Sequence, residues 1–295
     1  MIRKLESNEY VEYRALWCEV FGDEPEFIDE LYESTGAVAY AAWDDGVLHS
    51  FLTLFRAGVV TGKYDAEGDA EGRPVMVSYA ICTRPESRGR GYASELVRYV
   101  RNLVTSNGGI SLVCPAESGL EEFYAGLAYV PVFCACERNV EAEDIEVRTT
   151  VLSVTEYNRF REVFLADIPH VQFGLNLIDF IRHDSADAQG LILVNNGDAI
   201  CTISRYEDTE LVISELIVNP VLTAINSEIV EQLAAGLAKL FNARIARFRS
   251  IAQIVYTDDD GDHLSEGCYI QGMACGVAID AQESVALPYY GFPID

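Results

Sequence analysis

The residues best suited to chemistry form one short run, Arg88-Gly89-Arg90-Gly91-Tyr92-Ala93. Upstream, apolar residues alternate from Val75 to Ile81 as in a strand, and Pro85 ends that pattern. Downstream, apolar residues at helical spacing predict a helix over residues 93–104. A strand, a glycine-containing turn and a helix N-terminus together favour anion binding, because the glycines let the backbone approach and the first-turn N–H groups point at negative charge. We therefore expect a phosphate cradle at residues 88–93.

The charge of this stretch opposes the charge of the rest of the chain. The whole chain of 295 residues has a formal net charge of -26. A basic island on so acidic a chain favours a polyanionic ligand. A solvated helix face is the alternative, and the ordered succession of strand, proline, arginine, glycines and helix argues against it. The arginines of the island are Arg84, Arg88, Arg90, Arg98 and Arg101.

The run at residues 88–93 resembles the Arg/Gln-x-x-Gly-x-Gly/Ala signature of the GNAT superfamily of acyl-CoA-dependent N-acyltransferases. Further along, residues 123–129 (FYAGLAY) are similar to the family's Tyr-x-x-x-Gly-Phe ending. The resemblance covers roughly the first half of the chain. It implies acetyl-CoA as co-substrate and no metal. The residues that it implies for cofactor binding are Arg88, Gly89, Arg90, Gly91, Tyr92 and Ala93 for the pyrophosphate, and the backbone amides of Ile81, Cys82 and Thr83 for the thioester carbonyl.

The resemblance also implies catalytic roles. It assigns Tyr124 as the general acid, because the family's tyrosine lies near the coenzyme A sulfur and a reference pKa near 10 keeps it protonated. A packing tyrosine is the alternative. No carboxylate occurs in residues 77–82, where many relatives carry a glutamate. In its tandem layout the chain is similar to the enhanced-intracellular-survival acetyltransferases, which implies the C-terminal carboxylate of Asp295 as the base. A water chain is the other option.

The second half of the chain repeats the first weakly. Val77 to Pro85 (VSYAICTRP) matches Val212 to Pro220 (VISELIVNP), and a helix is predicted after each. Residues 221–225 contain neither glycine nor arginine, so the cradle cannot form there. We therefore expect an α/β (α+β) fold of two tandem GNAT-like domains, each a mixed, mostly antiparallel twisted sheet flanked by helices. The expected boundaries are 1–140 for the catalytic acyl-CoA-binding domain and 141–295 for a degenerate copy, with acidic residues 137–146 as the linker.

Local patterns predict the remaining elements. Asn8 can cap the first helix, and glycines 22 and 36 break the first and second helices. The turn at residues 44–46 (DDG) predicts a hairpin. The expected strands are residues 1–5, 37–43, 47–60, 110–114 and 129–136, and the expected helices are 8–21, 25–32, 120–127 and 226–241.

Composition narrows the class of protein. At 49% hydrophobic residues the chain can build a full core, and no apolar run approaches a membrane span. Eight cysteines without paired spacing favour a reducing, cytoplasmic setting over a disulfide framework. Cys134 and Cys136 would share one face of a strand; a metal pair is the alternative there, and core cysteines are expected because no second pair or nearby histidine supports a metal site. The acidity argues against nucleic acid as a partner and mildly for a cationic substrate. Acidic stretches at 63–73 and 258–262 fail the EF-hand spacing and are expected to be solvated loops.

These observations favour an N-acetyltransferase that moves an acetyl group from acetyl-CoA to a primary amine of a small, cationic substrate. Direct attack in a ternary complex is expected, since no cysteine is placed as an acyl carrier. The alternative is a non-catalytic acyl-CoA-binding or regulatory module, and a scaffold homodimer is a third hypothesis. Asp23, Glu24 and Glu26 could attract the amine or serve a helix dipole.

Overall fold

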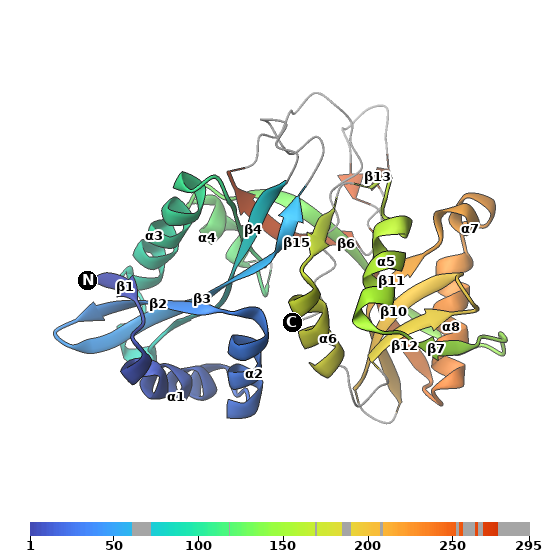
Figure 1. Cartoon of the computed structure of the whole chain (residues 1–295), viewed down its shortest axis with the longest axis horizontal. Coiled ribbons are helices and arrows are strands. Elements are labelled where there is room, and N and C mark those ends of the chain that lie inside the picture. The colour runs from blue at the N-terminus through green and yellow to red at the C-terminus, as the bar shows by residue number, and fades with distance from the viewer. Residues whose placement is uncertain are drawn as a thin grey trace. The chain divides into compact units, whose positions relative to one another are not determined.

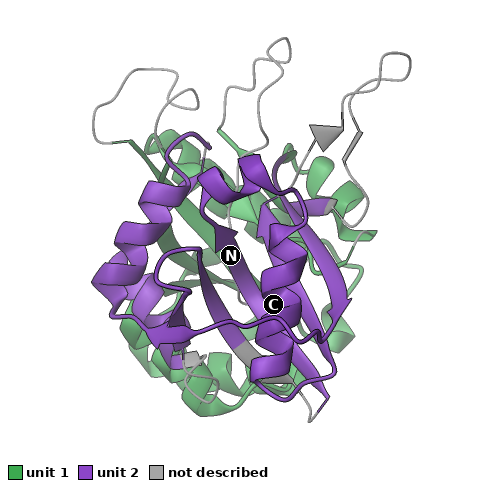
Figure 2. Cartoon of the chain, turned by 90° about the vertical axis from the view of Figure 1, so that its right-hand side faces the viewer, with its two compact units in different colours: residues 1–131, 272–280 green, residues 132–271, 281–295 purple. Residues whose placement is uncertain are grey.

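The computed structural model describes residues 1–60, 72–117, 119–168, 170–184, 190–206, 209–251, 254–255, 263–264 and 268–276. The chain forms two compact units, residues 1–131 with 272–280 and residues 132–271 with 281–295 (Figure 2). Whether the boundary expected at residue 140 separates independently folding domains stays a prediction.

The first unit is a mixed sheet flanked by helices (Figure 1). Its strands follow the order β1-β2-β3-β4-β5-β15, antiparallel throughout except for the parallel pair of β4 and β5. Helices α1 and α2 lie on one side of the strands and α3 on the other (Figure 1). The elements are β1 (Ile2–Lys4), α1 (Tyr10–Phe21), α2 (Pro25–Thr35), β2 (Val38–Asp44), β3 (Val47–Val60), β4 (Arg73–Thr83), α3 (Tyr92–Ser106), β5 (Ile110–Val113), α4 (Gly119–Ala125) and β15 (Cys268–Cys275).

The predicted breaks between the first elements are confirmed. Gly22 ends α1 at φ 80° and Gly36 ends α2 at φ 65°, both in the left-handed conformation that glycine adopts without strain. Pro25 opens α2 at its first turn, where no backbone N–H is needed. One cap differs from the prediction: a 3₁₀ turn at Ser7–Glu9 precedes α1, so Asn8 lies inside that turn.

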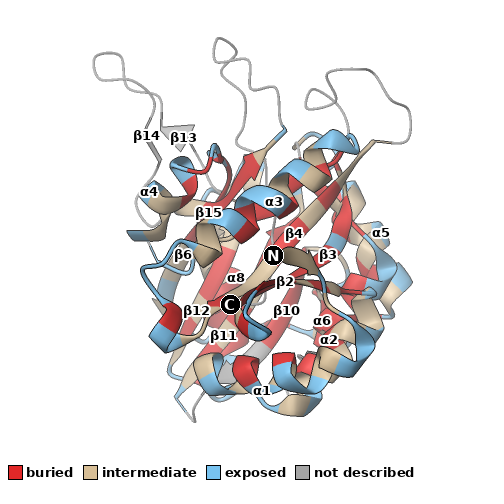
Figure 3. Cartoon of the chain, turned by 90° about the vertical axis from the view of Figure 1, so that its left-hand side faces the viewer, coloured by how far each residue is buried: buried red, intermediate tan, exposed pale blue. Residues whose placement is uncertain are grey.

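Aromatic side chains fill the first unit's core between α1 and the sheet. The Tyr13 and Phe51 rings lie 4.6 Å apart, and Trp17 stacks on Phe51 at 6.0 Å. The Tyr13 hydroxyl shares a 2.7 Å hydrogen bond with Thr53 of β3, so its buried oxygen has a partner. Figure 3 shows the buried residues along the strands and the inner faces of the helices. This packing fixes α1 against the middle of β3 and β4.

The second unit repeats the order of the first. Two helices, an antiparallel strand trio, a helix and a parallel strand follow one another, and the sheet order is β6-β12-β11-β10-β9-β7. The tandem repeat and the fold class predicted from the sequence are therefore confirmed. The elements are β6 (Val130–Glu141), β7 (Thr149–Val151), α5 (Val154–Phe164), β8 (Val171–Phe173), α6 (Leu175–Asp184), β9 (Gly190–Val194), β10 (Ala199–Tyr206), β11 (Glu210–Val218), α7 (Pro220–Ile225), α8 (Ile229–Leu240), β12 (Ile245–Ile251), β13 (Ile254–Val255) and β14 (His263–Leu264).

Each unit is completed by a strand that the sequence pattern did not assign to it. β15 is last along the chain, yet it pairs with β5 of the first unit, Met273 opposite Val113. β6 follows α4 directly and pairs with β12 of the second unit, Glu141 opposite Ile245. Neither pairing has a signature in local sequence, because both join residues more than 100 positions apart.

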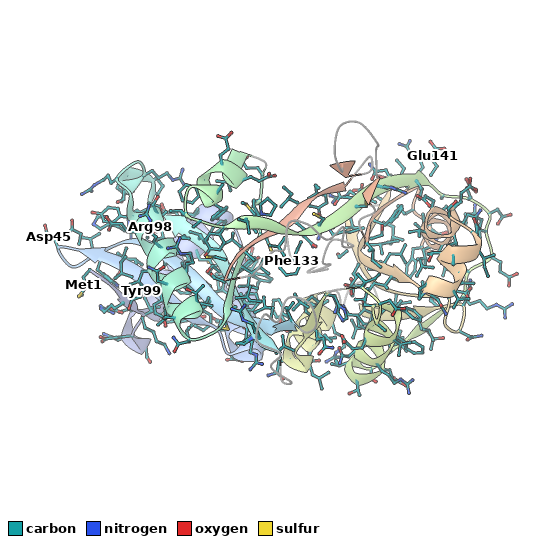
Figure 4. All side chains as sticks on the ribbon, turned by 90° about the horizontal axis from the view of Figure 1, so that it is seen from above. Met1, Asp45, Arg98, Tyr99, Phe133 and Glu141 are labelled. Carbon is teal, nitrogen blue, oxygen red and sulfur yellow. The ribbon has the colours of Figure 1, made fainter. Side chains whose placement is uncertain are left out.

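The acidic segment at residues 137–146 is a linker only in part, and the prediction is wrong for residues 137–141. β6 continues through Glu141, and Figure 4 labels Phe133 and Glu141 along this strand. The Glu137 carboxylate lies 3.7 Å from the Arg247 guanidinium and 3.6 Å from that of Arg249, both on β12. Strand pairing therefore places arginine side chains beside Glu137, which the acidic sequence alone does not predict.

The expectation of unpaired cysteines is wrong at one position. Cys136 is disulfide-bonded, whereas Cys134, two residues earlier on β6, is buried and forms no disulfide. Cross-strand neighbours decide which thiol can bridge, and sequence spacing does not reveal them. The described helices include none that is long and apolar enough to cross a membrane.

Candidate active site

The end of β4 carries a bulge. Thr53 of β3 faces Tyr79, and Phe51 faces Cys82, so Ala80 and Ile81 together oppose one residue, Leu52. Ala80 has φ 48°, a left-handed conformation that is uncommon for a residue with a side chain. A bulge bends its strand and redirects the groups that follow it. This bulge could not be predicted from the sequence, since neither glycine nor proline marks it.

β4 and β5 stop pairing close to this bulge. Their parallel pairing runs only from Val75 opposite Ile110 to Val77 opposite Leu112, although β4 continues to Thr83. The backbone beyond Val77 is therefore unpaired with β5. This opening between two parallel strands exposes one edge of β4 to a ligand.

Ladder geometry decides which amides face the opening. The Arg84 N–H donates to the His49 carbonyl of β3 at 2.9 Å. Because N–H groups alternate along a strand, the Cys82 N–H also points toward β3, whereas those of Ile81 and Thr83 point to the opposite edge. Of the three amides expected to face a thioester carbonyl, the geometry favours Ile81 and Thr83.

The turn after β4 has the backbone of an anion cradle. Gly89 and Gly91 have φ 74° and 86°, and a Cβ built on either would meet nothing within 4 Å. Glycine is therefore required here by conformation, and the space beside the turn is open. Gly91 is the N-cap of α3, and no side chain caps this helix. The N–H groups of Tyr92 and Ala93 in the first turn are thus directed outward, as an anion site needs.

Aromatic and polar contacts hold the turn at residues 88–93 in place. The His49 imidazole stacks on the Tyr92 ring with centroids 4.4 Å apart, and its Nδ1 lies 2.7 Å from the buried Ser87 Oγ. The Tyr92 hydroxyl donates to Asp44 at 3.1 Å, and the Arg90 guanidinium lies 5.1 Å from the Tyr92 ring. No local sequence motif points to His49, because its partners Ser87 and Tyr92 are far away in the chain.

The five arginines of the basic island divide by role. Arg84 is engaged by the Leu48 carbonyl and by Glu12, and Arg101 donates to the Leu127 carbonyl at the end of α4. Arg88 and Arg90 lie on the turn itself, where Arg88 Nε donates to the Thr83 carbonyl at 3.3 Å. Arg98 stands exposed on α3, beside the labelled Tyr99 in Figure 4. The turn arginines are the ones placed to meet an anion in the cradle.

Tyr124 is buried on α4 with its ring against another tyrosine. Its centroid lies 6.0 Å from Tyr129, whose hydroxyl shares a 2.8 Å hydrogen bond with Ser111 of β5. Burial, reinforced by Tyr129 and Cys114, raises the pKa of Tyr124 well above its usual value. The phenol therefore stays protonated at neutral pH, which a general acid requires.

The thiol nearest the bulge is unsuited to carry an acyl group. Cys82 is buried, and desolvation raises the pKa of its thiol to about 12 against the lowering influence of Arg88 and Arg84. Its reactive thiolate is therefore scarce at neutral pH. Direct attack without a covalent intermediate stays a prediction.

The carboxylates expected to attract an amine are partly engaged. Asp23 accepts a 2.6 Å hydrogen bond from the Trp17 indole. Glu24 is the N-cap of α2 and Glu26 lies in its first turn, positions that serve the helix dipole. Across the described residues no group of three or more potential metal ligands occurs. Asp295, the loop expected at residues 63–73 up to residue 71, and the acidic run at 258–262 lie outside the described residues.

At the corresponding turn of the second unit, the described residues 219–225 form no equivalent cradle. Pro220 directly begins α7, capped by Asn219, whose Oδ1 accepts from the Val221 N–H at 3.0 Å. The pairing of β10 with β11 also shifts register, between Thr202 and Ile203, and Glu215 lies opposite Thr202. A buried ion pair lies there: Arg161 Nε is 3.2 Å from Glu215 Oε1. The absence of glycine after Pro220 predicted this difference. In the structure, a helix begins immediately where the first unit has its glycine turn.

The fold is one that known proteins share. Residues 3–128 match the family model described as Acetyltransferase (GNAT) family. The chain has the GNAT acetyltransferase fold, as solved structures of similar layout also indicate.

Three of these structures come from bacteria. A probable N-acyltransferase from Enterococcus faecalis V583 is 14% identical with a TM-score of 0.64, and a GCN5-related N-acetyltransferase from Anabaena variabilis is 13% identical with a TM-score of 0.63. Each comparison covers 93% of this chain and 72% of the other. Eis1 from Mycobacterium abscessus is 13% identical with a TM-score of 0.55, covering 93% of this chain and 73% of Eis1. None of the curated protein sequences matches the chain.

Proposed function

We propose that this protein is an acetyl-CoA-dependent N-acetyltransferase whose acceptor is a primary amine on a small, cationic molecule. The observation that carries the proposal is the conjunction, in one unit, of an uncapped α3 N-terminus behind Gly89 and Gly91 with a β4 edge that separates from β5. A diphosphate suits the first feature, and an extended pantetheine chain suits the second. The co-substrate supplies the activated acetyl thioester.

Different residues of the chain bind the cofactor, stabilise the developing charge and donate a proton. The backbone of residues 88–93 holds the pyrophosphate, with Arg88 and Arg90 adding positive charge. The outward N–H groups of Ile81 and Thr83 stabilise the negative charge that develops on the carbonyl oxygen, and one such donor is typically worth about 2.7–4 kcal/mol of barrier. Tyr124 donates its proton to the departing thiolate.

Removal of the amine's proton is the step for which the sequence offers least. By resemblance, the carboxylate of Asp295 is the proposed base. Deleting the last three residues tests this role: a large fall in kcat with unchanged acetyl-CoA binding supports it, and full turnover removes it.

The proposed activity is tested by thiol release. Protein and acetyl-CoA are mixed with a panel of mono-, di- and polyamines, and release of the coenzyme A thiol is followed with and without amine. We expect amine-dependent release that falls strongly in Tyr124→Phe. Tight coenzyme A binding in calorimetry without release for any amine would favour the alternative, a non-catalytic acyl-CoA-binding module. If the protein does not bind coenzyme A at all, both the transferase and the acyl-CoA-binding module are ruled out.

A further inference from the structure

Two hydroxyl groups meet at the end of β4. Ser50 of β3 lies opposite Thr83 of β4, and the Ser50 side chain is fully buried. The Ser50 Oγ donates to the Cys82 carbonyl at 2.6 Å and lies 3.0 Å from the Thr83 Oγ1. Because a serine hydroxyl has a single proton, Ser50 must accept from Thr83 while it donates to the carbonyl. Thr83 Oγ1, Ser50 Oγ and the Cys82 carbonyl thus form a hydroxyl chain in which each hydrogen bond strengthens the next.

The hydroxyl chain acts on the peptide that carries one of the outward amides. A peptide bond is planar and trans, so the Thr83 N–H points away from the Cys82 carbonyl of the same peptide. Ser50 binds that carbonyl on the β3 side, and the N–H is therefore directed to the opposite edge of β4. The Thr83 carbonyl faces this edge too, since it accepts from Arg88 on the turn. A hydrogen bond to a peptide carbonyl also polarises the peptide and makes its N–H a stronger donor.

The second unit has apolar residues at both positions of the hydroxyl pair. In the repeat between the two halves of the chain, Val218 corresponds to Thr83. The partner of Val218 on β10 is Ala199, which therefore corresponds to Ser50. Both apolar residues are buried. The hydroxyl pair thus occurs in the unit with the glycine turn, and the unit without that turn has alanine and valine instead.

The backbone at the strand end has the same geometry in both units. In the first unit, the Arg84 N–H donates to the His49 carbonyl at 2.9 Å. In the second unit, the Asn219 N–H donates to the Asp198 carbonyl at 2.8 Å. The strands therefore pair in the same way with or without the hydroxyl chain. Strand pairing does not require these hydroxyls, which favours a role for them at the site beside the turn.

We propose that Ser50 is a positioning residue for the transfer: through the Cys82–Thr83 peptide, it aims and polarises the N–H that stabilises negative charge on the thioester carbonyl oxygen. This inference rests on the proposed acetyltransferase function. Because Ser50 is buried, it acts through that peptide rather than by contact with acyl-CoA. Its hydroxyl fixes the N–H before acyl-CoA binds, so the amide need not reorient as charge develops on the oxygen.

Kinetics of Ser50→Ala and of Ser50→Ala/Thr83→Val test this role, and the second unit already folds with alanine and valine at these positions. We expect Ser50→Ala to lower kcat about tenfold, less than the roughly 10²–10³-fold lost with a whole oxyanion-hole donor. The affinity for acetyl-CoA in calorimetry should change by less than about threefold, because the turn at residues 88–93 holds the diphosphate. The double variant should lose little more, because both hydroxyls act through one peptide.

A matched control removes a similar hydrogen bond elsewhere in the first unit. The Thr35 hydroxyl at the end of α2 donates to the Leu31 carbonyl at 2.6 Å, the same distance as in the Ser50 contact. Thr35→Val should therefore keep the wild-type kcat. An equal fall of kcat in Thr35→Val and Ser50→Ala would show a general effect of losing such a bond and would overturn the proposal.

The Thr83 amide gives a readout that a purely structural role would not move. In protein made with isotopically labelled threonine, its NMR peak is identified by its absence from Thr83→Val. Acetyl-CoA should shift this amide proton downfield in wild type and less in Ser50→Ala. Equal shifts in the two proteins, a wild-type kcat in Ser50→Ala, or a loss confined to acetyl-CoA affinity would each overturn the assignment. If wild type binds acetyl-CoA but releases no thiol with any amine, the proposed function fails, whereas the amide shift still shows whether Ser50 directs the Thr83 N–H.

Discussion

His49 and Tyr92 lie face to face, with ring centroids 4.4 Å apart and planes tilted by only 1°. One ring belongs to β3 and the other is the first residue of α3, so the stack ties the strand to the start of the helix. His49 also bonds Ser87, which lies in the turn just before Arg88. The orientation of the cradle therefore depends on a residue nearly 40 positions upstream, and no contact of His49 with a ligand is needed for it to matter.

Replacing that brace should weaken coenzyme A binding without abolishing it. Stacked aromatic pairs contribute about 0.5–1.5 kcal/mol, so His49→Ala should raise the Kd for coenzyme A about two- to twelvefold. Calorimetry of His49→Ala and His49→Phe measures this, and Phe should restore part of the affinity because it keeps the stack. His183→Ala, on α6 of the second unit, is the control. Unchanged affinity in His49→Ala would show that the turn holds its shape alone.

The cradle glycines allow a matched comparison. Gly91 and Gly36 both have positive φ and no neighbour that a Cβ would meet, yet only Gly91 faces the proposed diphosphate. A side chain at such a φ costs about 1–2 kcal/mol, so both Gly91→Glu and Gly36→Glu should lower the free energy of unfolding similarly. Coenzyme A binding should be lost only in Gly91→Glu, where the carboxylate repels the phosphates. Equal binding by both variants in calorimetry would remove the cradle.

Local sequence signals predicted much of the first unit. What they could not predict has a physical reason. Gly22, Gly36 and Gly91 fall where the chain needs a left-handed residue, so turns and helix starts could be read directly from the sequence. The bulge at Ala80 and the pairing of β15 with β5 could not, because they arise from strands that meet only in the folded chain. His49 was missed as a site residue for the same reason: its partners, Ser87 and Tyr92, are set by tertiary structure.

Tyr124→Phe should separate chemistry from packing. The phenylalanine keeps the ring contact with Tyr129, so the free energy of unfolding should change by less than about 1 kcal/mol, the usual net worth of one hydrogen bond. Loss of the acid should lower kcat by about 10²–10⁴ with little change in coenzyme A affinity. Tyr99→Phe on the exposed side of α3 is the control. A kcat for Tyr124→Phe equal to wild type would make this residue a packing tyrosine.

The pH dependence of that step follows from burial. The folded protein raises the pKa of Tyr124 above its ordinary value of 10, so the proton that it donates is retained up to and beyond pH 10. The wild-type profile of kcat should therefore show no descending limb below about pH 10 that belongs to this residue. Because the folded protein favours the neutral form of Tyr124, this group stabilises the fold below pH 10. That stabilisation is lost only as the pH rises above 10. A descending limb near pH 7–8 that Tyr124→Phe removes would contradict the assignment.

The second unit should depend on its buried ion pair. The side chains of Arg161 and Glu215 are 0% and 3% exposed, and Glu215 also accepts a 2.7 Å hydrogen bond from Tyr157. Removing one partner of such a pair leaves an uncompensated charge, so Arg161→Met or Glu215→Leu should each cost about 3–5 kcal/mol of unfolding free energy. The double variant should be less destabilised than the sum, because neither charge remains. Denaturant unfolding of the four proteins measures the coupling, and additive losses would mean that the two side chains contribute independently to the core.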